Sequence, residues 1–119
     1  ARIDYMSADC LFCNIANGDM GTSFFYEDEL IVAFEDISPQ APVHMLIIPK
    51  KHISTLNELQ PEDAELVGTL VLCARNIAEK YSIKESGYRL LFNCNREGGQ
   101  TVYHLHMHLI GGRQLGALG

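Results

Sequence analysis

Hydrophobic residues recur with two different periods along the chain, and the changes of period predict where strands and helices lie. Short runs rich in β-branched and aromatic residues predict strands over 24–27, 30–34 and 43–48. Two further strands are expected over 87–93 and 103–110, with the loop 94–101 between them. The chain therefore carries five candidate strands, which follow one another with few interruptions.

A helical period replaces the strand pattern at two places. Residues 10–16 predict a short helix that ends at Asn17-Gly18. A long helix is expected to begin near Pro61, because proline suits the first helical turn and acidic residues follow it near the positive end of the helix dipole. Between residues 67 and 81 apolar side chains keep the i, i+3, i+4, i+7 spacing of a half-buried helix.

The order of these elements predicts the fold class. Strands in succession, rather than in alternation with helices, argue against a doubly wound parallel fold. We expect an α+β domain, an antiparallel sheet of about five strands with one long and one short helix against one face. The 119 residues suffice for a single domain over 6–119, and residues 1–5 ahead of Met6 are interpreted as a remnant of expression.

Composition and charge limit the partners. The net charge is −6 and the only basic cluster is 50–52, so binding to bulk nucleic acid is not expected. No apolar run approaches the roughly 20 residues of a membrane-spanning helix, and the N-terminus shows no secretory pattern. We therefore expect a cytoplasmic protein with no membrane partner. Its cysteines should be thiols or metal ligands rather than disulfides, with Cys73 and Cys94 as packing residues.

The most unusual segment is YHLHMHL over 103–109, in which imidazole and apolar side chains alternate strictly. Alternate residues of a strand share a face, so His104, His106 and His108 should lie together. The apolar residues between them must then face the core. The three imidazoles are left to line a second surface.

Three interpretations of this surface remain open. It could be a solvent-exposed face on which histidines gather by coincidence. It could be a metal site, although the outer two Cα atoms of an extended strand would lie about 13.6 Å apart, far for three ligands with bonds near 2.1 Å. It could also be catalytic, since an imidazole with a pKa near 6.5 is a neutral nucleophile at neutral pH.

The loop before the histidines favours catalysis. An ordinary turn would explain Gly98-Gly99 alone, but paired glycines also let backbone N–H groups approach an oxyanion. Gln100, Thr101 and Asn93 add neutral donors nearby. Beside three histidines, the loop indicates a phosphate cradle that lacks lysine, arginine or a Mg²⁺ motif. A phosphoryl group held by neutral donors and attacked by imidazole fits this pattern.

At this point the residues resemble a known family. The motif HLHMHL over 104–109 is similar to the signature of the histidine-triad (HIT) superfamily. The segments GGQTVYHLHMHLIGGRQLG and AFEDISPQAPVHMLIIPKKHI resemble the Hint branch, the nucleoside phosphoramidate hydrolases, in a bacterial member. The resemblance runs from about Cys10 to Gly116. It implies a single HIT-like domain and a homodimer in which the two sheets join.

Residue by residue, the resemblance implies a nucleotide site. His106 would be the nucleophile, and the residues that orient it and manage protons would be His44, His104 and His108. The α-phosphate would be surrounded by Asn93, Gly99, Gln100, Thr101 and Val102. The ribose hydroxyls would donate to Asp36. The base would be walled by Leu11, Phe12, Ile15, Phe34 and Ile37, although plain core packing is an equal interpretation for Phe12, Ile15 and Phe34.

The implied activity is hydrolysis of a purine nucleoside 5′-phosphoramidate through a nucleotidyl-histidine, releasing a nucleoside monophosphate and an amine. No metal or organic cofactor would be needed for this chemistry. Two alternatives remain, hydrolysis of dinucleoside polyphosphates and a non-catalytic nucleotide-binding or scaffold role. The branch commonly has serine at Thr101, and the tail RQLGALG lacks the tryptophan of many relatives, so the leaving-group side stays open.

Cys10 and Cys13 have two interpretations. They could be buried small residues, or half of a tetrahedral zinc site. Some HIT relatives hold zinc with such a pair and two histidines, which here are His52 and His104. A structural zinc on these four residues would hold the N-terminal helix against the sheet. It would also remove His104 from any proton relay.

Overall fold

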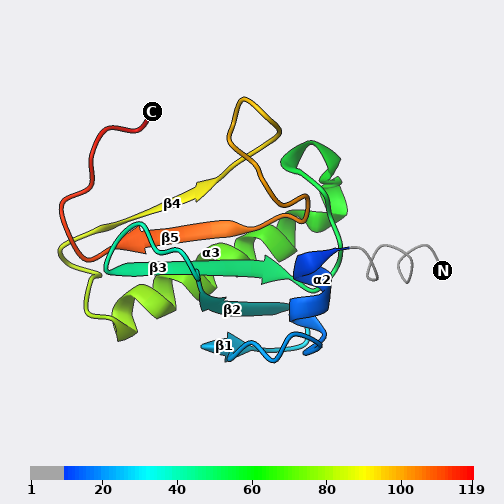
Figure 1. The fold of residues 1–119 in the computed structure, drawn as a ribbon, viewed down its shortest axis with the longest axis horizontal. Helices are drawn as coiled ribbons and strands as arrows, with labels where there is room; N and C mark the ends of the chain where they lie inside the picture. The colour runs from blue at the N-terminus through cyan, green and yellow to red at the C-terminus, as the bar shows by residue number, and fades with distance from the viewer. Residues whose placement is uncertain (1–9) are drawn as a thin grey trace.

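The computed structural model describes residues 10–119, so the expectation for residues 1–5 lies outside it. At its centre is an antiparallel five-stranded sheet in the order β1-β2-β3-β5-β4 (Figure 1). The strands are β1 (Tyr26–Glu27), β2 (Ile31–Glu35), β3 (Val43–Pro49), β4 (Tyr88–Phe92) and β5 (Met107–Gly111). The helices are α2 (Leu11–Ala16) and α3 (Ala64–Lys80), with 3-10 turns η1 (Leu56–Glu58) and η2 (Pro61–Asp63). The expected α+β class, five strands, and long and short helices are confirmed.

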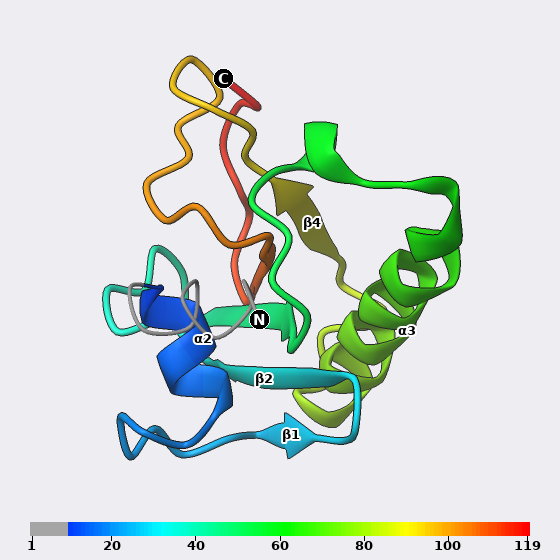
Figure 2. The ribbon, with the colours of Figure 1, turned by 90° about the vertical axis from the view of Figure 1, so that its right-hand side faces the viewer.

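The two helices lie on opposite faces of the sheet, which corrects the expectation that both cover one face (Figure 2). β3 is buried along its whole length, and β2 is buried except at its last residue. Strands that are apolar on both faces need cover on both faces. The long helix α3 covers one face, and α2 covers the other with Phe12, Ile15 and Ala16.

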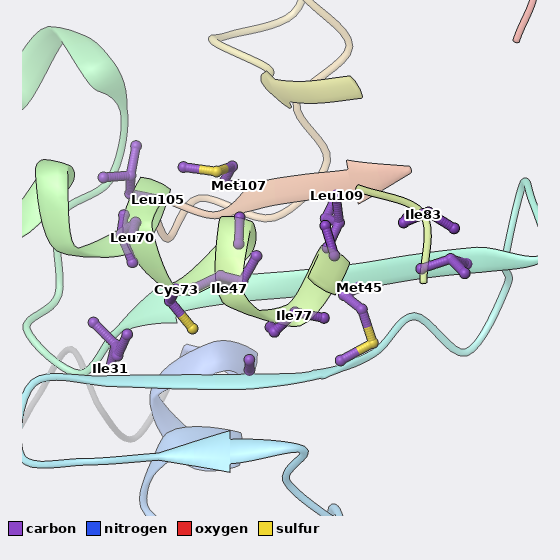
Figure 3. Packing of buried hydrophobic residues seen from close by; sticks show 14 of the residues in the cluster. Ile31, Met45, Ile47, Leu70, Cys73, Ile77, Ile83, Leu105, Met107 and Leu109 are labelled. Carbon is purple, nitrogen blue, oxygen red and sulfur yellow. The ribbon is translucent and has the colours of Figure 1, made fainter. Parts of the chain in front are cut away.

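The core under α3 is formed by the helical stripe that the sequence shows. Leu70 and Ile77 are buried against the sheet, and Cys73 lies between them in the same core (Figure 3). Burial raises the pKa of the Cys73 thiol to about 11, so it stays protonated and packs as a small apolar group. Asp63 precedes the helix and accepts the Gln60 N–H at 2.9 Å. Within residues 10–119, neither α2 nor α3 has the length and apolar character needed to cross a membrane.

The histidine segment is less regular than expected. The ladder of β5 begins only at Met107, which pairs with Ile47, whereas β3 continues to Pro49 through its pairing with β2. Pro49 has no N–H to donate to the segment before Met107. Alternation nevertheless extends back to Leu105, whose N–H donates to the Ile53 carbonyl at 2.6 Å. Leu105, Met107 and Leu109 all lie in the core under α3 (Figure 3). The intervening histidines therefore face the side of the sheet that carries α2.

Candidate active site

Three imidazoles form a continuous row on the α2 face. In the β3–β5 register His108 lies opposite Leu46, so His44, two residues earlier in β3, is its diagonal neighbour. The ring centroids of His44 and His108 are 5.1 Å apart, and those of His106 and His108 are also 5.1 Å apart. The fold therefore brings together His108 from β5, His106 from the segment just before β5, and His44 from β3, 64 residues away from His108.

His106 has the tautomer that a nucleophile needs. Its Nδ1 lies 2.8 Å from the His104 carbonyl oxygen. A carbonyl can only accept, so Nδ1 carries the proton and Nε2 keeps its lone pair. Burial lowers the pKa of His106 below its usual value, against smaller opposing effects of the His104 carbonyl and the Asp36 carboxylate. The edge of Phe12 packs on this ring at 5.0 Å between centroids, so His106 is held neutral and fixed in orientation.

His44 and His108 form a hydrogen-bonded pair whose direction is set by the backbone. The Gln40 N–H donates to His44 Nδ1 at 3.0 Å, so His44 carries its proton on Nε2. That proton is donated to His108 Nδ1 at 2.9 Å, which leaves the His108 proton on Nε2. Burial is the main effect that lowers the pKa of His108 to about 4, followed by the neighbouring His106 and His44. His108 is therefore neutral at neutral pH.

Asp36 lies beside this pair. One carboxylate oxygen is 3.5 Å from His44 Nε2, and the other accepts the Ser38 N–H at 2.8 Å. Asp36, His44 and His108 lie close enough to hold a metal ion. A metal on His44 Nε2 would require the proton to move to Nδ1, where the Gln40 N–H already points. The hydrogen-bond direction therefore favours a proton network over a metal at these three residues.

The loop before the histidines uses several of its donors to hold itself together. Both N–H bonds of the Gln100 side chain are taken, by the carbonyls of Ser54 at 2.9 Å and Val102 at 3.0 Å. The Gly99 N–H donates to the Arg96 carbonyl, and Asn93 donates to the Gly98 carbonyl at 2.6 Å. Gln100 in this conformation braces the loop and has no side-chain N–H left for a phosphate.

Only a few donors of this loop are left free for an external acceptor. Thr101 is exposed and Val102 is half-buried, and neither donates a hydrogen bond within residues 10–119. Their backbone N–H groups and the Thr101 hydroxyl can therefore serve an external acceptor. Gly99 has φ +83°, a backbone conformation that favours glycine.

The five residues expected to wall the base separate into two groups. Phe12, Ile15 and Phe34 are buried in the core between α2 and the sheet, and Phe12 packs edge-on against Phe34 at 6.0 Å. Core packing is thus their observed role. Leu11 is 45% exposed and Ile37 is 98% exposed, so these two side chains are available to a ligand. Contact of any of the five with a base stays a prediction.

The second cluster consists of the four residues expected to bind zinc, Cys10, Cys13, His52 and His104, whose donor atoms all lie within 4.8 Å of one another. His104 Nδ1 is 3.3 Å from the Cys10 sulfur and 3.4 Å from the Cys13 sulfur, while His52 Nδ1 is 3.3 Å from the Cys13 sulfur. Zinc bonds of 2.3 Å to sulfur and 2.1 Å to nitrogen imply about 3.6 Å between such atoms in a tetrahedron.

The ring of His104 is oriented for this cluster. Its Nε2 lies 2.8 Å from the Pro49 carbonyl, so Nε2 carries the proton and the Nδ1 lone pair faces the sulfurs. The chemistry and spacing of the four donors fit zinc. Because both ring nitrogens are engaged here, the ring of His104 lies outside the His44–His108 pair.

We predict that the protein loses stability as the pH falls from about 6.5 toward about 5. The pKa of His108 is about 4 in the folded protein, whereas an unfolded imidazole titrates near 6.5. Between these values the unfolded state binds more protons, so acid favours unfolding, while above about 6.5 this contribution is complete. Urea unfolding over this range should show the decline, and a His108→Asn variant should show a shallower one. A wild-type stability independent of pH would contradict the assignment of a neutral buried His108.

Comparison with known proteins identifies the family. The sequence profile of the HIT domain matches residues 17–115, so the chain belongs to the HIT family. It is 47% identical over 113 residues to the purine nucleoside phosphoramidase of Escherichia coli K12, and the match covers 95% of each chain. The resemblance stated from the motifs is thereby confirmed.

Solved structures agree with this assignment. A HIT family hydrolase from Legionella pneumophila Philadelphia 1 superposes with a TM-score of 0.88 at 52% identity, covering 89% of this chain and 95% of that one. A histidine triad protein from Clostridium difficile superposes with a TM-score of 0.89 at 37% identity, covering 93% and 96%. The fold is that of HIT proteins, and the similarity to these relatives supports hydrolase activity.

Proposed function

We propose that the protein hydrolyses the P–N bond of purine nucleoside 5′-phosphoramidates through a covalent intermediate on His106. The observation that carries the proposal is the His106 tautomer, in which the His104 carbonyl holds Nδ1–H and leaves the Nε2 lone pair for phosphorus. The E. coli relative is named a purine nucleoside phosphoramidase, which supports this substrate class over the dinucleoside polyphosphates. A nucleotide scaffold without turnover is the remaining alternative.

The first step forms a bond from His106 Nε2 to the α-phosphorus and breaks the P–N bond. The amine leaves with one added proton, which the hydrogen-bonded pair of His44 and His108 passes on from solvent to the leaving nitrogen, so that neither imidazole becomes an anion. In the second step water attacks the nucleotidyl-histidine, releases the nucleoside monophosphate and returns the proton. The sum is one phosphoramidate and one water converted to one monophosphate and one amine. His104 acts as a positioning residue through its carbonyl.

The α-phosphate is assigned to the N–H groups of Thr101 and Val102 and to the Thr101 hydroxyl, because those donors are not used within the loop. Donors fixed before the reaction stabilise the negative charge that builds up at phosphorus. The loop conformation is stabilised by the hydrogen bonds of Asn93, Gly99 and Gln100. Asp36 stays the proposed acceptor for the ribose hydroxyls, in addition to its contacts with Ser38 and His44.

We also propose a structural zinc on Cys10, Cys13, His52 and His104, as the spacing of their donor atoms supports. Such an ion supplies cross-linking rather than catalysis, because two thiolates and two imidazoles fill a tetrahedral shell. The four ligands come from the start of α2, the segment after β3 and the segment before β5. Together they fix α2, whose Phe12 packs on His106.

We propose that the protein binds two partners, a purine nucleotide and a second copy of the chain. Within residues 10–119, β4 pairs with another strand on one side only. A free edge of this kind is where the sheet of a second copy can join, as expected for the homodimer. A measurement of the molecular mass in solution tests whether the protein is a dimer.

A substrate comparison tests the proposed function. The protein is expected to turn over a fluorogenic adenosine 5′-phosphoramidate with a kcat/KM at least about tenfold above that for a diadenosine polyphosphate, a difference of ~1.4 kcal/mol in barrier. Reaction in ¹⁸O-labelled water should place the label in the monophosphate, because water attacks phosphorus. Faster cleavage of the dinucleotide would establish the polyphosphate alternative. Tight nucleotide binding without turnover of either compound would establish the scaffold alternative.

A further inference from the structure

The segment that follows β5 contacts the loop between β2 and β3 at two points. Gly112 has φ +95°, and a Cβ on it would lie 2.9 Å from the Pro42 Cβ, so only glycine fits this turn. The next residue, Arg113, donates from Nη2 to the Gln40 carbonyl at 2.8 Å. The pairing of Val43 with Gly111 explains why these segments meet.

Both backbone hydrogen-bonding groups of Gln40 are engaged. Its carbonyl accepts from Arg113, and its N–H donates to His44 Nδ1 at 3.0 Å. The surrounding residues 37–40 are exposed. Among the described residues, Arg113 is the only side chain outside this loop that donates to its backbone between residues 37 and 41. The position of the Gln40 N–H therefore depends on few contacts besides that of Arg113.

The Gln40 N–H holds the His44 proton on Nε2, where the Asp36 carboxylate at 3.5 Å also favours it. While it points at Nδ1, the proton must sit on Nε2 and be donated to His108 Nδ1. If it turned away, His44 could carry the proton on Nδ1 instead. His108 Nδ1 would then lose its donor, and His108 would no longer be held with its own proton on Nε2.

We propose that Arg113 is a positioning residue for the reaction, acting through Gln40 to hold His44 and His108 in their working tautomers. This inference rests on the proposed function for the part that concerns turnover. The part that concerns the tautomer of His44 is independent of any substrate. Arg113 lies outside the histidine motif, and its guanidinium touches neither imidazole of the pair.

The test uses an Arg113→Ala variant with two comparisons. Arg113→Lys keeps one charged donor that can reach the Gln40 carbonyl. Arg89→Ala is the matched control, because Arg89 also donates to a backbone carbonyl, that of Gly116 at 2.9 Å, but does not contact the loop of residues 37–41. Thermal melting checks that all three variants are folded.

The first readout is the ¹⁵N spectrum of histidine-labelled, ligand-free protein, with His44 assigned from a His44→Gln variant. Wild type and Arg89→Ala are expected to show His44 protonated at Nε2 alone. Arg113→Ala should show a mixture of the Nε2–H and Nδ1–H forms, and Arg113→Lys should restore most of the wild-type signal. An unchanged His44 spectrum in folded Arg113→Ala overturns the proposal, whatever the substrate proves to be.

The second readout is steady-state turnover. Arg113→Ala is expected to lower kcat about tenfold, which is ~1.4 kcal/mol of barrier, with KM changed less than about twofold. The lysine variant should recover most of the loss. A rise in KM without a change in kcat would also overturn the proposal, since it would make Arg113 a substrate contact. A protein inactive on phosphoramidates that still shows the tautomer mixture would refute the proposed function and leave the positioning role standing.

Discussion

Replacing His106 by alanine is expected to lower turnover of an adenosine phosphoramidate by at least about 10⁴-fold, because the attacking atom is removed. Among the histidines of residues 10–119, none but His106 has a proton fixed on Nδ1 by a backbone carbonyl and a free Nε2. Nucleotide binding should change far less, because the proposed phosphate donors at Thr101 and Val102 stay in place.

The matched variant is His106→Asn. An asparagine amide can still donate to the His104 carbonyl, as Nδ1 does, but it offers nothing in place of Nε2. It should therefore preserve the local fold and be as inactive as the alanine variant. Either variant retaining more than about a tenth of wild-type kcat/KM would contradict the mechanism, since tenfold is only ~1.4 kcal/mol of barrier.

Purified protein is expected to contain about one zinc per chain. Loss of this metal should lower the melting temperature more than any other predicted change. The Cys10→Ser, Cys13→Ser double variant should lose the zinc. Its melting temperature should fall by at least about 8 °C, since ~2 kcal/mol shifts a domain of this size by roughly that much. The physical reason is the loss of a cross-link between α2, the segment after β3 and the segment before β5.

Cys94→Ser is the control for this experiment, because Cys94 is partly buried but lies outside the cluster. It should keep the zinc and melt near wild type. At low temperature the double variant should retain much of its turnover, because no ligand of the cluster reacts with substrate. Metal-free wild type of unchanged stability would make Cys10 and Cys13 ordinary packing residues. Loss of turnover without loss of stability would instead place the metal in the active site.

The sequence predicts most of the strand pattern and the shared face of the histidines, because alternation is a local property of an extended chain. His106 and His108 face α2 while Leu105 and Met107 face α3, as expected. The sequence also contains the signal that both faces of the sheet are covered. The runs 30–34 and 43–48 are apolar without alternation, apart from His44, which indicates strands covered on both faces, and α2 covers the second face.

The parts of the site that sequence reasoning missed depend on backbone atoms. Every residue except proline has a backbone N–H, so the identity of residue 40 as glutamine does not indicate that this group fixes the tautomer of His44. The sequence shows that Gln100 lies in the loop before the histidines, but the residue type does not reveal that the carbonyls of Ser54 and Val102 accept both of its side-chain N–H groups. Donor identity is readable from sequence, whereas donor availability depends on the fold.

The central claim is that His106 forms a bond to phosphorus, and the stereochemical course at phosphorus tests it most directly. An adenosine thiophosphoramidate of known configuration is hydrolysed in ¹⁸O-labelled water, and the configuration of the labelled thiophosphate product is determined. Attack by His106 followed by attack of water inverts phosphorus twice, so the account predicts overall retention of configuration. Inversion would mean that water displaces the amine in a single step and that no nucleotidyl-histidine forms.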